Sequence, residues 1–205
     1  LDLAPGVLRE LGLVRALDAV DKGDLVPPPY ADFVRPPGGV RNERGVESYS
    51  RALAAVVENA LDDGCFPVVL GGDCSIVLGG LLGATRHAGR VGLAYVDGHA
   101  DFASPEESAT GSAASMCLAL VVGRGDSSLA RLAGAPLVRA QDVALIGRRD
   151  EGQPYGDDAL NVSGILDLDD TVMVQQVVDG ELDAEIGAVA ERLQVSQTRT
   201  EVIRP

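Results

Sequence analysis

Short apolar segments alternate with helical patterns along this chain of 205 residues, and that alternation limits the possible folds more than any other feature. Apolar residues at 53, 56, 57, 60 and 61 follow the spacing of one helical face, and Gly64 then supplies a stop signal. The predicted strands cover residues 68–70, 91–96 and 143–146, with a fourth beginning at 165–166, and the other predicted helices lie at 8–17, 76–84, 113–122 and 182–193. Strands that alternate with helices are typical of βαβ units, so we expect an α/β fold with a mainly parallel sheet.

Composition narrows the classes of function. The formal net charge is −14 and Lys22 is the only lysine, so the chain lacks the basic face of a nucleic-acid-binding protein. No apolar run approaches the roughly 18 residues that span a bilayer, so we expect no membrane insertion. Three cysteines without a signal-peptide pattern favour a reducing, cytoplasmic location, and 46% hydrophobic residues suit a single domain over 1–205.

The most informative motif is D-G-H-A-D at residues 97–101, directly after the predicted strand at 91–96. In an extended segment, residues two apart face the same side, so Asp97, His99 and Asp101 would converge on one point. Carboxylate and imidazole together suit Mn²⁺, Fe²⁺, Co²⁺ or Zn²⁺. A polar turn with solvated acids is the alternative, but three potential ligands in alternation behind a buried strand favour a metal site.

A second polar motif, G-G-D-C-S at residues 71–75, follows the predicted strand at 68–70. The carboxyl ends of parallel strands line one edge of a sheet, so we expect Cys74 to lie beside the D-G-H-A-D motif. Taken alone, Cys74 is either a metal ligand or a small buried hydrophobic residue. Asp73 and Ser75 are candidates to cap the helix that follows.

Together, V-L-G-G-D-C-S at 69–75 and Y-V-D-G-H-A-D-F at 95–102 resemble the arginase/agmatinase (ureohydrolase) family, whose signatures read G-G-D-H-S and D-A-H-A-D. The P-P-P-Y segment at 27–30 and S-Y-S-R-A-L at 48–53 are also similar to this family, and the resemblance covers roughly residues 1–150. It implies an arginase-like three-layer α/β/α fold and a homo-oligomeric assembly. It also implies two Mn²⁺ ions whose bridging hydroxide attacks a guanidinium carbon and releases urea.

The resemblance also assigns residues to roles. His99 would bind one ion, while Asp97 and Asp101 would bridge or ligate both, and Asp101, the catalytic residue, would also orient the hydroxide. Cys74 stands where the family has a histidine ligand, and its softer thiolate would favour Zn²⁺ over Mn²⁺.

The loop after Asp101 departs from the family pattern, in which it binds the amino-acid end of the substrate. Ala103 stands at the place of an asparagine and Ala114 at the place of a histidine, while Thr110-Gly111 replaces Ser-Gly. Thr110 is therefore the substrate-binding candidate in this loop. Glu201, in E-V-I-R-P at the end of the sequence, faintly resembles the family's late acid that binds guanidinium.

A dinuclear site also needs carboxylates from a second strand, and Asp167 and Asp169 are the candidates. We expect them on one face of a strand next to the one that ends at Asp97. The D-P that follows this pair in the family is missing here, and the chain is shortened between about 150 and 180. The alternative is that the true pair is absent from the sequence.

Three readings of function stay open. The first is a ureohydrolase-type metal hydrolase that acts on a linear C–N bond of a guanidino compound. The second is a catalytically inactive family member with a structural or binding role, which Cys74, Ala103 and Ala114 favour. The third rests on I-L-D-L-D-D-T-V at 165–172, which matches the nucleophile motif of haloacid-dehalogenase-like phosphatases, although that family needs a downstream lysine and none follows here.

Overall fold

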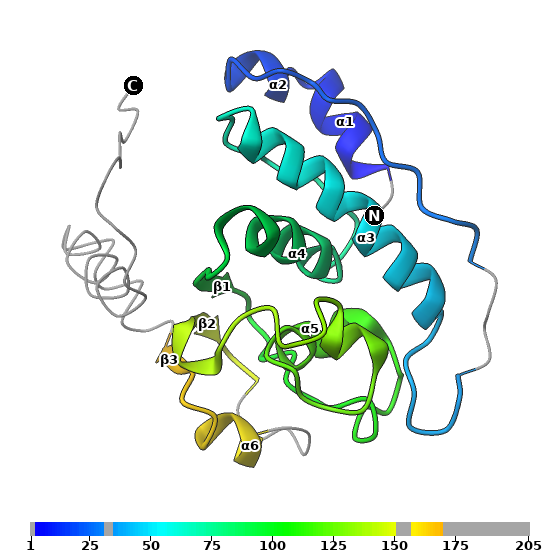
Figure 1. Ribbon diagram of the computed structural model, residues 1–205, viewed down its shortest axis with the longest axis vertical. Helices are drawn as coiled ribbons and strands as arrows, with labels where there is room; N and C mark the ends of the chain where they lie inside the picture. The colour runs from blue at the N-terminus through cyan, green and yellow to red at the C-terminus, as the bar shows by residue number, and fades with distance from the viewer. Residues whose placement is uncertain (1–2, 31–34, 151–156, 170–205) are drawn as a thin grey trace. The chain divides into compact units, whose positions relative to one another are not determined.

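A computed structural model describes residues 3–30, 35–150 and 157–169 of the chain (Figure 1). The chain divides into two compact units. The first, called the helical unit, comprises Leu1–Val91 and Asp101–Leu137, and the second, called the strand unit, comprises Gly92–Ala100 and Val138–Pro205. The boundary between Ala100 and Asp101 falls inside the D-G-H-A-D motif.

The helical unit opens with two short helices, α1 (Ala4–Glu10) and α2 (Leu13–Ala16), in place of the single helix expected from the leucine spacing. The interruption has a local cause. Gly12 lies between them with a φ of 90°, a left-handed conformation that favours glycine and cannot continue a right-handed helix.

The long helix α3 (Glu43–Asp62) confirms the amphipathic pattern predicted for residues 53–61. Its end is a Schellman motif, in which the Gly64 N–H donates to Leu61 O and the Cys65 N–H donates to Ala60 O, both at 2.9 Å. Gly64 adopts the φ of 74° that this motif requires, so the predicted stop signal is confirmed with its mechanism.

Helix α4 (Ile76–Ala88) packs along α3, as Figure 1 shows, and glycine makes that contact possible. A Cβ placed on Gly79 would lie 2.8 Å from Leu53 Cβ, and one placed on Gly83 would lie 2.6 Å from the Ala54 carbonyl oxygen. Both distances are too short for real atoms. The two helix backbones therefore approach each other only because these positions carry no side chain.

The rest of the helical unit confirms the helical prediction for residues 113–122. A 3₁₀ turn, η1 (Ala113–Met116), leads into α5 (Cys117–Val121), and another turn, η2 (Ser128–Arg131), follows. Every residue of α5 is fully buried, which accounts for its unbroken apolar sequence.

The strand unit contains a three-stranded parallel sheet in the order β1-β2-β3, built from β1 (Leu93–Val96), β2 (Val143–Arg148) and β3 (Leu166–Asp169). The 3₁₀ turn η3 (Ala140–Asp142) precedes β2, and α6 (Asp157–Asn161) precedes β3. The strands predicted at 91–96, 143–146 and 165–166 are thus confirmed, as is the parallel pairing. Residues 143–145 of β2 are buried without alternation, as expected for the central strand of a parallel sheet.

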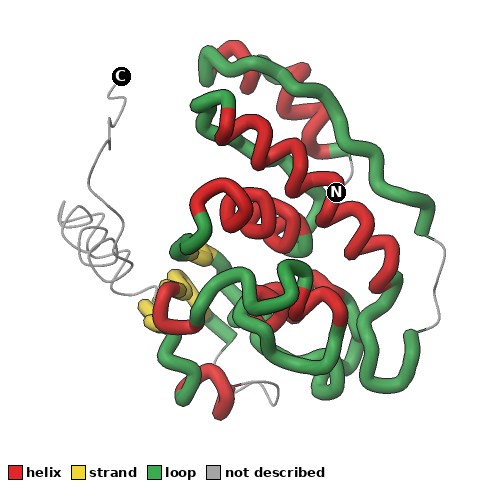
Figure 2. Tube along the Cα trace, in the orientation of Figure 1, coloured by secondary structure: helices red, strands yellow, loops and turns green. Residues whose placement is uncertain are grey.

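Two expectations are wrong. Residues 68–70 form no strand and lie in the loop between α3 and α4 (Figure 2), where Val68 is 57% exposed. An apolar run becomes a strand only with a hydrogen-bonded neighbour, which the run itself does not encode. In addition, β3 pairs with β2 and not with β1, because β2 occupies the position beside β1.

The predicted final helix at 182–193 lies outside the described residues. Within the described part of the chain, no helix is both long and apolar enough to cross a membrane. The single domain predicted over 1–205 stays a prediction.

Candidate metal centre

The G-G-D-C-S segment forms the entrance to α4. Asp73 Oδ1 accepts hydrogen bonds from the backbone N–H of Ser75 at 2.9 Å and from its hydroxyl at 2.5 Å. This turn fixes the backbone on both sides of Cys74, whose carbonyl oxygen accepts the Val77 N–H at 3.1 Å. The side chain of Cys74 is thereby carried on a rigid helix start.

Within the helical unit the structure brings Cys74 and Asp101 together. The Cys74 sulfur and an Asp101 carboxylate oxygen lie within 4.8 Å of each other, and both residues are half-buried. The Asp101 backbone is held by α5, because its carbonyl oxygen accepts the Ala119 N–H at 3.2 Å. A thiolate and a carboxylate at this separation can share one metal ion without a large rearrangement.

Asp97 and His99 belong to the strand unit. The Asp97 N–H donates to Ile146 O at 3.1 Å, which extends the β1–β2 ladder by one residue and fixes Asp97 at the carboxyl end of the sheet. Its Oδ1 accepts the His99 N–H at 3.0 Å, while the His99 ring nitrogen Nδ1 lies 3.6 Å from the same oxygen. The His99 side chain is 74% exposed and the Asp97 side chain 23% exposed.

The expected alternation along residues 97–101 is wrong at the level of the backbone. The strand ends at Val96, the chain bends at residues 98 and 99, and Asp101 adopts a left-handed φ of 46°. The rule that residues two apart share a face holds only for an extended segment. The positions of the three side chains are therefore set by a turn that the spacing did not predict.

Asp167 lies on β3, where its Oδ2 accepts a hydrogen bond from Arg148 Nη1 at 3.2 Å. Arg148 also donates through Nε to Asp150 Oδ1 at 2.9 Å, and Asp150 Oδ2 accepts the Ala100 N–H at 3.1 Å. Sequence reasoning missed Arg148 and Asp150, although G-R-R-D at 147–150 directly follows the predicted strand at 143–146 and so marks the same sheet edge. The side chain of Asp169 lies outside the described residues.

The loop from residue 102 to 112 is pinned by two arginines. Arg35 donates to the carbonyl oxygens of Ser108 at 2.6 Å and Pro105 at 2.5 Å. Arg124 pairs with both carboxylate oxygens of Glu107, at 2.7 and 2.8 Å. The hydrogen bond from Arg124, followed by one from the Ser104 backbone N–H, lowers the pKa of Glu107 below its ordinary value.

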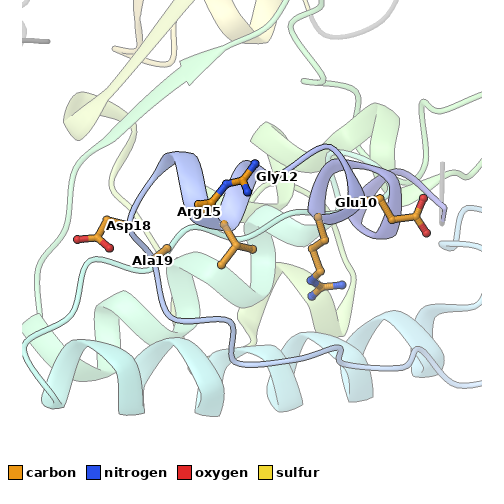
Figure 3. Close-up of a pocket in the computed structure, with 7 residues that line it drawn as sticks. Glu10, Gly12, Arg15, Asp18 and Ala19 are labelled. Carbon is orange, nitrogen blue, oxygen red and sulfur yellow. The ribbon is translucent and has the colours of Figure 1, made fainter.

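Among the substrate-loop candidates, Thr110 is exposed and its Oγ1 accepts the Ser112 N–H at 3.2 Å. Ala103 is buried and Ala114 half-buried. Glu201 lies outside the described residues. A surface pocket beside α1 and α2 is lined by Arg9, Glu10, Gly12, Val14, Arg15, Asp18 and Ala19 (Figure 3), and none of the predicted site residues lines it.

Comparison with known proteins decides the family. The model of the arginase family matches residues 4–193 of the chain. The chain belongs to the arginase family. The arginase of Bacillus caldovelox is 35% identical over 163 residues, which make up 75% of this chain and 54% of that protein. The arginase of Staphylococcus aureus (strain COL) is 32% identical over 157 residues, 73% of this chain and 52% of that protein.

Solved structures of arginases are similar in fold to this arginase-family chain. The native structure of Bacillus caldovelox arginase at pH 5.6 matches with a TM-score of 0.77 and 29% identity, covering 93% of this chain and 64% of that one. Bacillus cereus arginase matches with a TM-score of 0.76 and 28% identity, covering 94% and 64%. The predicted arginase-like α/β fold is confirmed. The chain spans about half the length of the curated relatives it matches.

Proposed function

We propose that this arginase-family chain is a metal-dependent hydrolase that cleaves a linear C–N bond of a guanidino compound. The observation that carries the proposal is that Cys74 and Asp101, 27 positions apart in the sequence, have ligand atoms within 4.8 Å of each other. Family membership supports the same reaction class, since the similar relatives are named arginases. The relatives give no support to the catalytically inactive alternative.

The donor set fits a divalent cation. We propose Cys74, Asp97, His99 and Asp101 as ligands on the basis of the two motifs, with Mn²⁺ as the metal and Zn²⁺ as its competitor at the softer Cys74. Two ions would need Asp167 and Asp169 as well. When bound, the metal supplies the Lewis acidity that makes water a nucleophile near neutral pH.

The chain's own residues would then complete the reaction. Asp101 is half-buried beside Cys74, so in this proposal its carboxylate orients the attacking water and accepts its proton. Water adds to the guanidinium carbon, the C–N bond to the substrate amine breaks, and urea and a protonated amine are released. We propose Thr110 and Glu201 as contacts to the substrate outside the reacting centre.

The test uses the 205-residue chain loaded with Mn²⁺ and measures urea released from L-arginine and from agmatine. We expect urea from one of the two substrates, and we expect Asp101→Asn to lower the rate of urea release by at least about 100-fold. Loss of a residue that only hydrogen-bonds to a metal ligand costs about 10–100-fold in activity, and loss of a ligand itself should cost more. The matched control is Asp126→Asn, which removes one carboxylate that is 96% exposed. Urea release by the chain that is equally fast in Asp101→Asn would contradict the proposal, as would no Mn²⁺ binding at all.

Two further predictions remain, namely the assembly into a homo-oligomer that the resemblance implies and the cytoplasmic location that the cysteines indicate. Light scattering on the purified chain measures the first directly. A mass equal to that of one chain at micromolar concentration would contradict the prediction of a homo-oligomer.

A further inference from the structure

Asp101, one of the two candidate ligands in the helical unit, has a strained backbone. Its φ of 46° lies in the left-handed region, which a non-glycine residue keeps only where the surrounding structure holds it there. The direction of its carboxylate follows from that backbone, and so does the approach of the carboxylate to within 4.8 Å of the Cys74 sulfur. The contacts that hold the backbone therefore decide whether the two side chains can share a metal ion.

Two consecutive carbonyl groups here are held by the end of α5 and the turn that follows it. The Asp101 carbonyl oxygen accepts the Ala119 N–H at 3.2 Å, and the Phe102 carbonyl oxygen accepts Arg124 Nη1 at 2.5 Å. Ala119 also accepts the Arg124 N–H at 2.8 Å, so both contacts come from one connected turn. Ala119 is fully buried, which gives that turn a rigid base. The peptide groups on the carboxyl side of Asp101 are thus fixed at both oxygens.

The Arg124 side chain makes two further contacts with the same segment. Its Cζ atom lies 5.3 Å from the centre of the Phe102 ring, and Phe102 is only 3% exposed. Its guanidinium pairs with both carboxylate oxygens of Glu107, and Glu107 accepts the Ser104 N–H at 2.9 Å. We call Arg124, Phe102 and Glu107 the arginine clamp. A planar guanidinium can hold all of these partners at once, which a lysine ammonium cannot do.

Glycines on both sides direct Arg124 toward the clamp. Gly123 and Gly125 have φ values of 83° and 90°, which reverse the chain after α5. A Cβ on Gly123 would overlap the Pro136 ring, and one on Gly125 would overlap the Pro105 ring. The turn therefore requires glycine at both positions, and it fixes the point from which the Arg124 side chain extends.

We propose that Arg124 is a positioning residue for the metal centre, because the arginine clamp holds the Asp101 carboxylate beside Cys74 in a geometry that binds a divalent ion. The inference rests on the proposed function, in which Cys74 and Asp101 are ligands. Arg124 acts through the backbone and not by contact with the ion. Without the clamp, the backbone at Asp101 can relax toward an ordinary φ, and this relaxation turns the carboxylate away from Cys74.

The experiment is equilibrium dialysis of the 205-residue chain against Mn²⁺, with the dissociation constant measured for the wild type and for Arg124→Met. We expect the constant to rise about tenfold in the variant, the lower end of the roughly 10–100-fold effect of residues that orient a metal ligand. Circular dichroism checks that the variant is folded.

The matched control is Arg51→Met. Arg51 in α3 has the same kinds of partner, since it donates to the Glu47 carboxylate at 2.8 and 3.0 Å and to the Leu132 carbonyl oxygen at 3.1 Å. These hydrogen bonds reach neither ligand, so the Mn²⁺ dissociation constant should change by less than about twofold. Equal losses of Mn²⁺ affinity in Arg51→Met and Arg124→Met would show a general effect of stability and would overturn the inference.

A second variant covers the case in which Arg124→Met does not fold. The Arg124 side chain is 23% exposed, so the polar, uncharged Arg124→Gln should be tolerated, but its shorter amide cannot hold both Phe102 and Glu107. We again expect a rise of about tenfold in the Mn²⁺ dissociation constant.

The outcomes separate the two proposals. If the wild type binds Mn²⁺ and a folded variant at Arg124 binds it equally tightly, the positioning role is overturned and the metal hydrolase stands. If the wild type binds no Mn²⁺, the proposed function is overturned and the inference with it.

Discussion

The α3–α4 contact of the helical unit and the carboxyl end of β2 in the strand unit are stabilised by different kinds of interaction. Between the helices, Gly79 and Gly83 leave no room for even one added carbon atom. At the sheet edge, Arg148 lies between the carboxylates of Asp150 and Asp167. Shape decides the first contact and charge decides the second.

The difference teaches where each unit tolerates change. A packed helix contact should reject volume whatever its polarity, because the interior cannot expand at low cost. A charge-paired edge should accept volume but reject the loss of a charged partner. Substitutions matched in size and charge can test this comparison.

The largest expected effect is in the helix contact. Gly83→Val would press side-chain carbon into the Ala54 carbonyl oxygen and the Val57 side chain, so we expect it to lower the free energy of unfolding by about 3 kcal/mol. Urea denaturation followed by circular dichroism measures the change. A loss below about 1 kcal/mol would show that the two helices separate easily.

Gly80→Ala is the control for this experiment. Gly80 is in the same helix with no atom within 4 Å of a Cβ, so the substitution should raise stability by roughly 0.5–1 kcal/mol through helix propensity alone. If the free energy of unfolding rises in Gly80→Ala and falls in Gly83→Val, the difference is due to the lack of room for a side chain at Gly83.

The second prediction tests charge in the strand unit without touching the metal ligands. Arg139 pairs with Asp142 at 2.7 Å, and the Asp142 side chain is only 3% exposed. Arg139→Met keeps most of the volume but removes the charged partner of a buried carboxylate, so we expect a loss of about 2 kcal/mol. Arg131→Met, at an exposed pair, should change the free energy of unfolding by less than about 0.5 kcal/mol. Equal effects in the two variants would contradict the comparison.

The smallest effect concerns the pinned loop of the helical unit, where charge is used at the surface. Glu107 is 41% exposed and its pKa is lowered, first by the hydrogen bond from Arg124. Glu107→Gln should therefore cost only about 1 kcal/mol at pH 7. Because the folded-state pKa lies below the unfolded one, this contribution is present above the ordinary value of about 4.3 and disappears as the pH falls through the lowered pKa. Denaturation of the wild type and of Glu107→Gln at several pH values from 7 to 3 should show their free energies of unfolding converging. A difference that stays constant with pH would exclude the Glu107–Arg124 pair as its cause.

Much of the fold could be predicted because it depends on local patterns. The periodicity of α3, the glycine stop at Gly64 and the apolar runs of β1 and β2 all depend on neighbours in sequence. The run at 68–70 failed because strand formation depends on a distant partner. The order β1-β2-β3 also depends on which segments meet, and no local pattern records that.

The candidate site was predicted in part for the same reason. The motifs identified Cys74 and Asp101 as candidate metal ligands, and the structure brings the two side chains together. The exposure of His99 follows from a bend that strand periodicity cannot describe. Arg148 was overlooked because its direction depends on a one-residue bulge at Gly147, which reverses the face that simple alternation would assign.

The left-handed backbone of Asp101 restricts how the site could be lost over evolutionary time. With a φ of 46°, this position accepts asparagine and glycine readily but penalises branched side chains. A lineage that abandoned the metal would thus drift first to asparagine or glycine, which remove the carboxylate and leave the turn intact. Descendants with valine or isoleucine there would have to rebuild the turn as well, so the identity of the replacement would record whether the chemistry or the architecture was given up first.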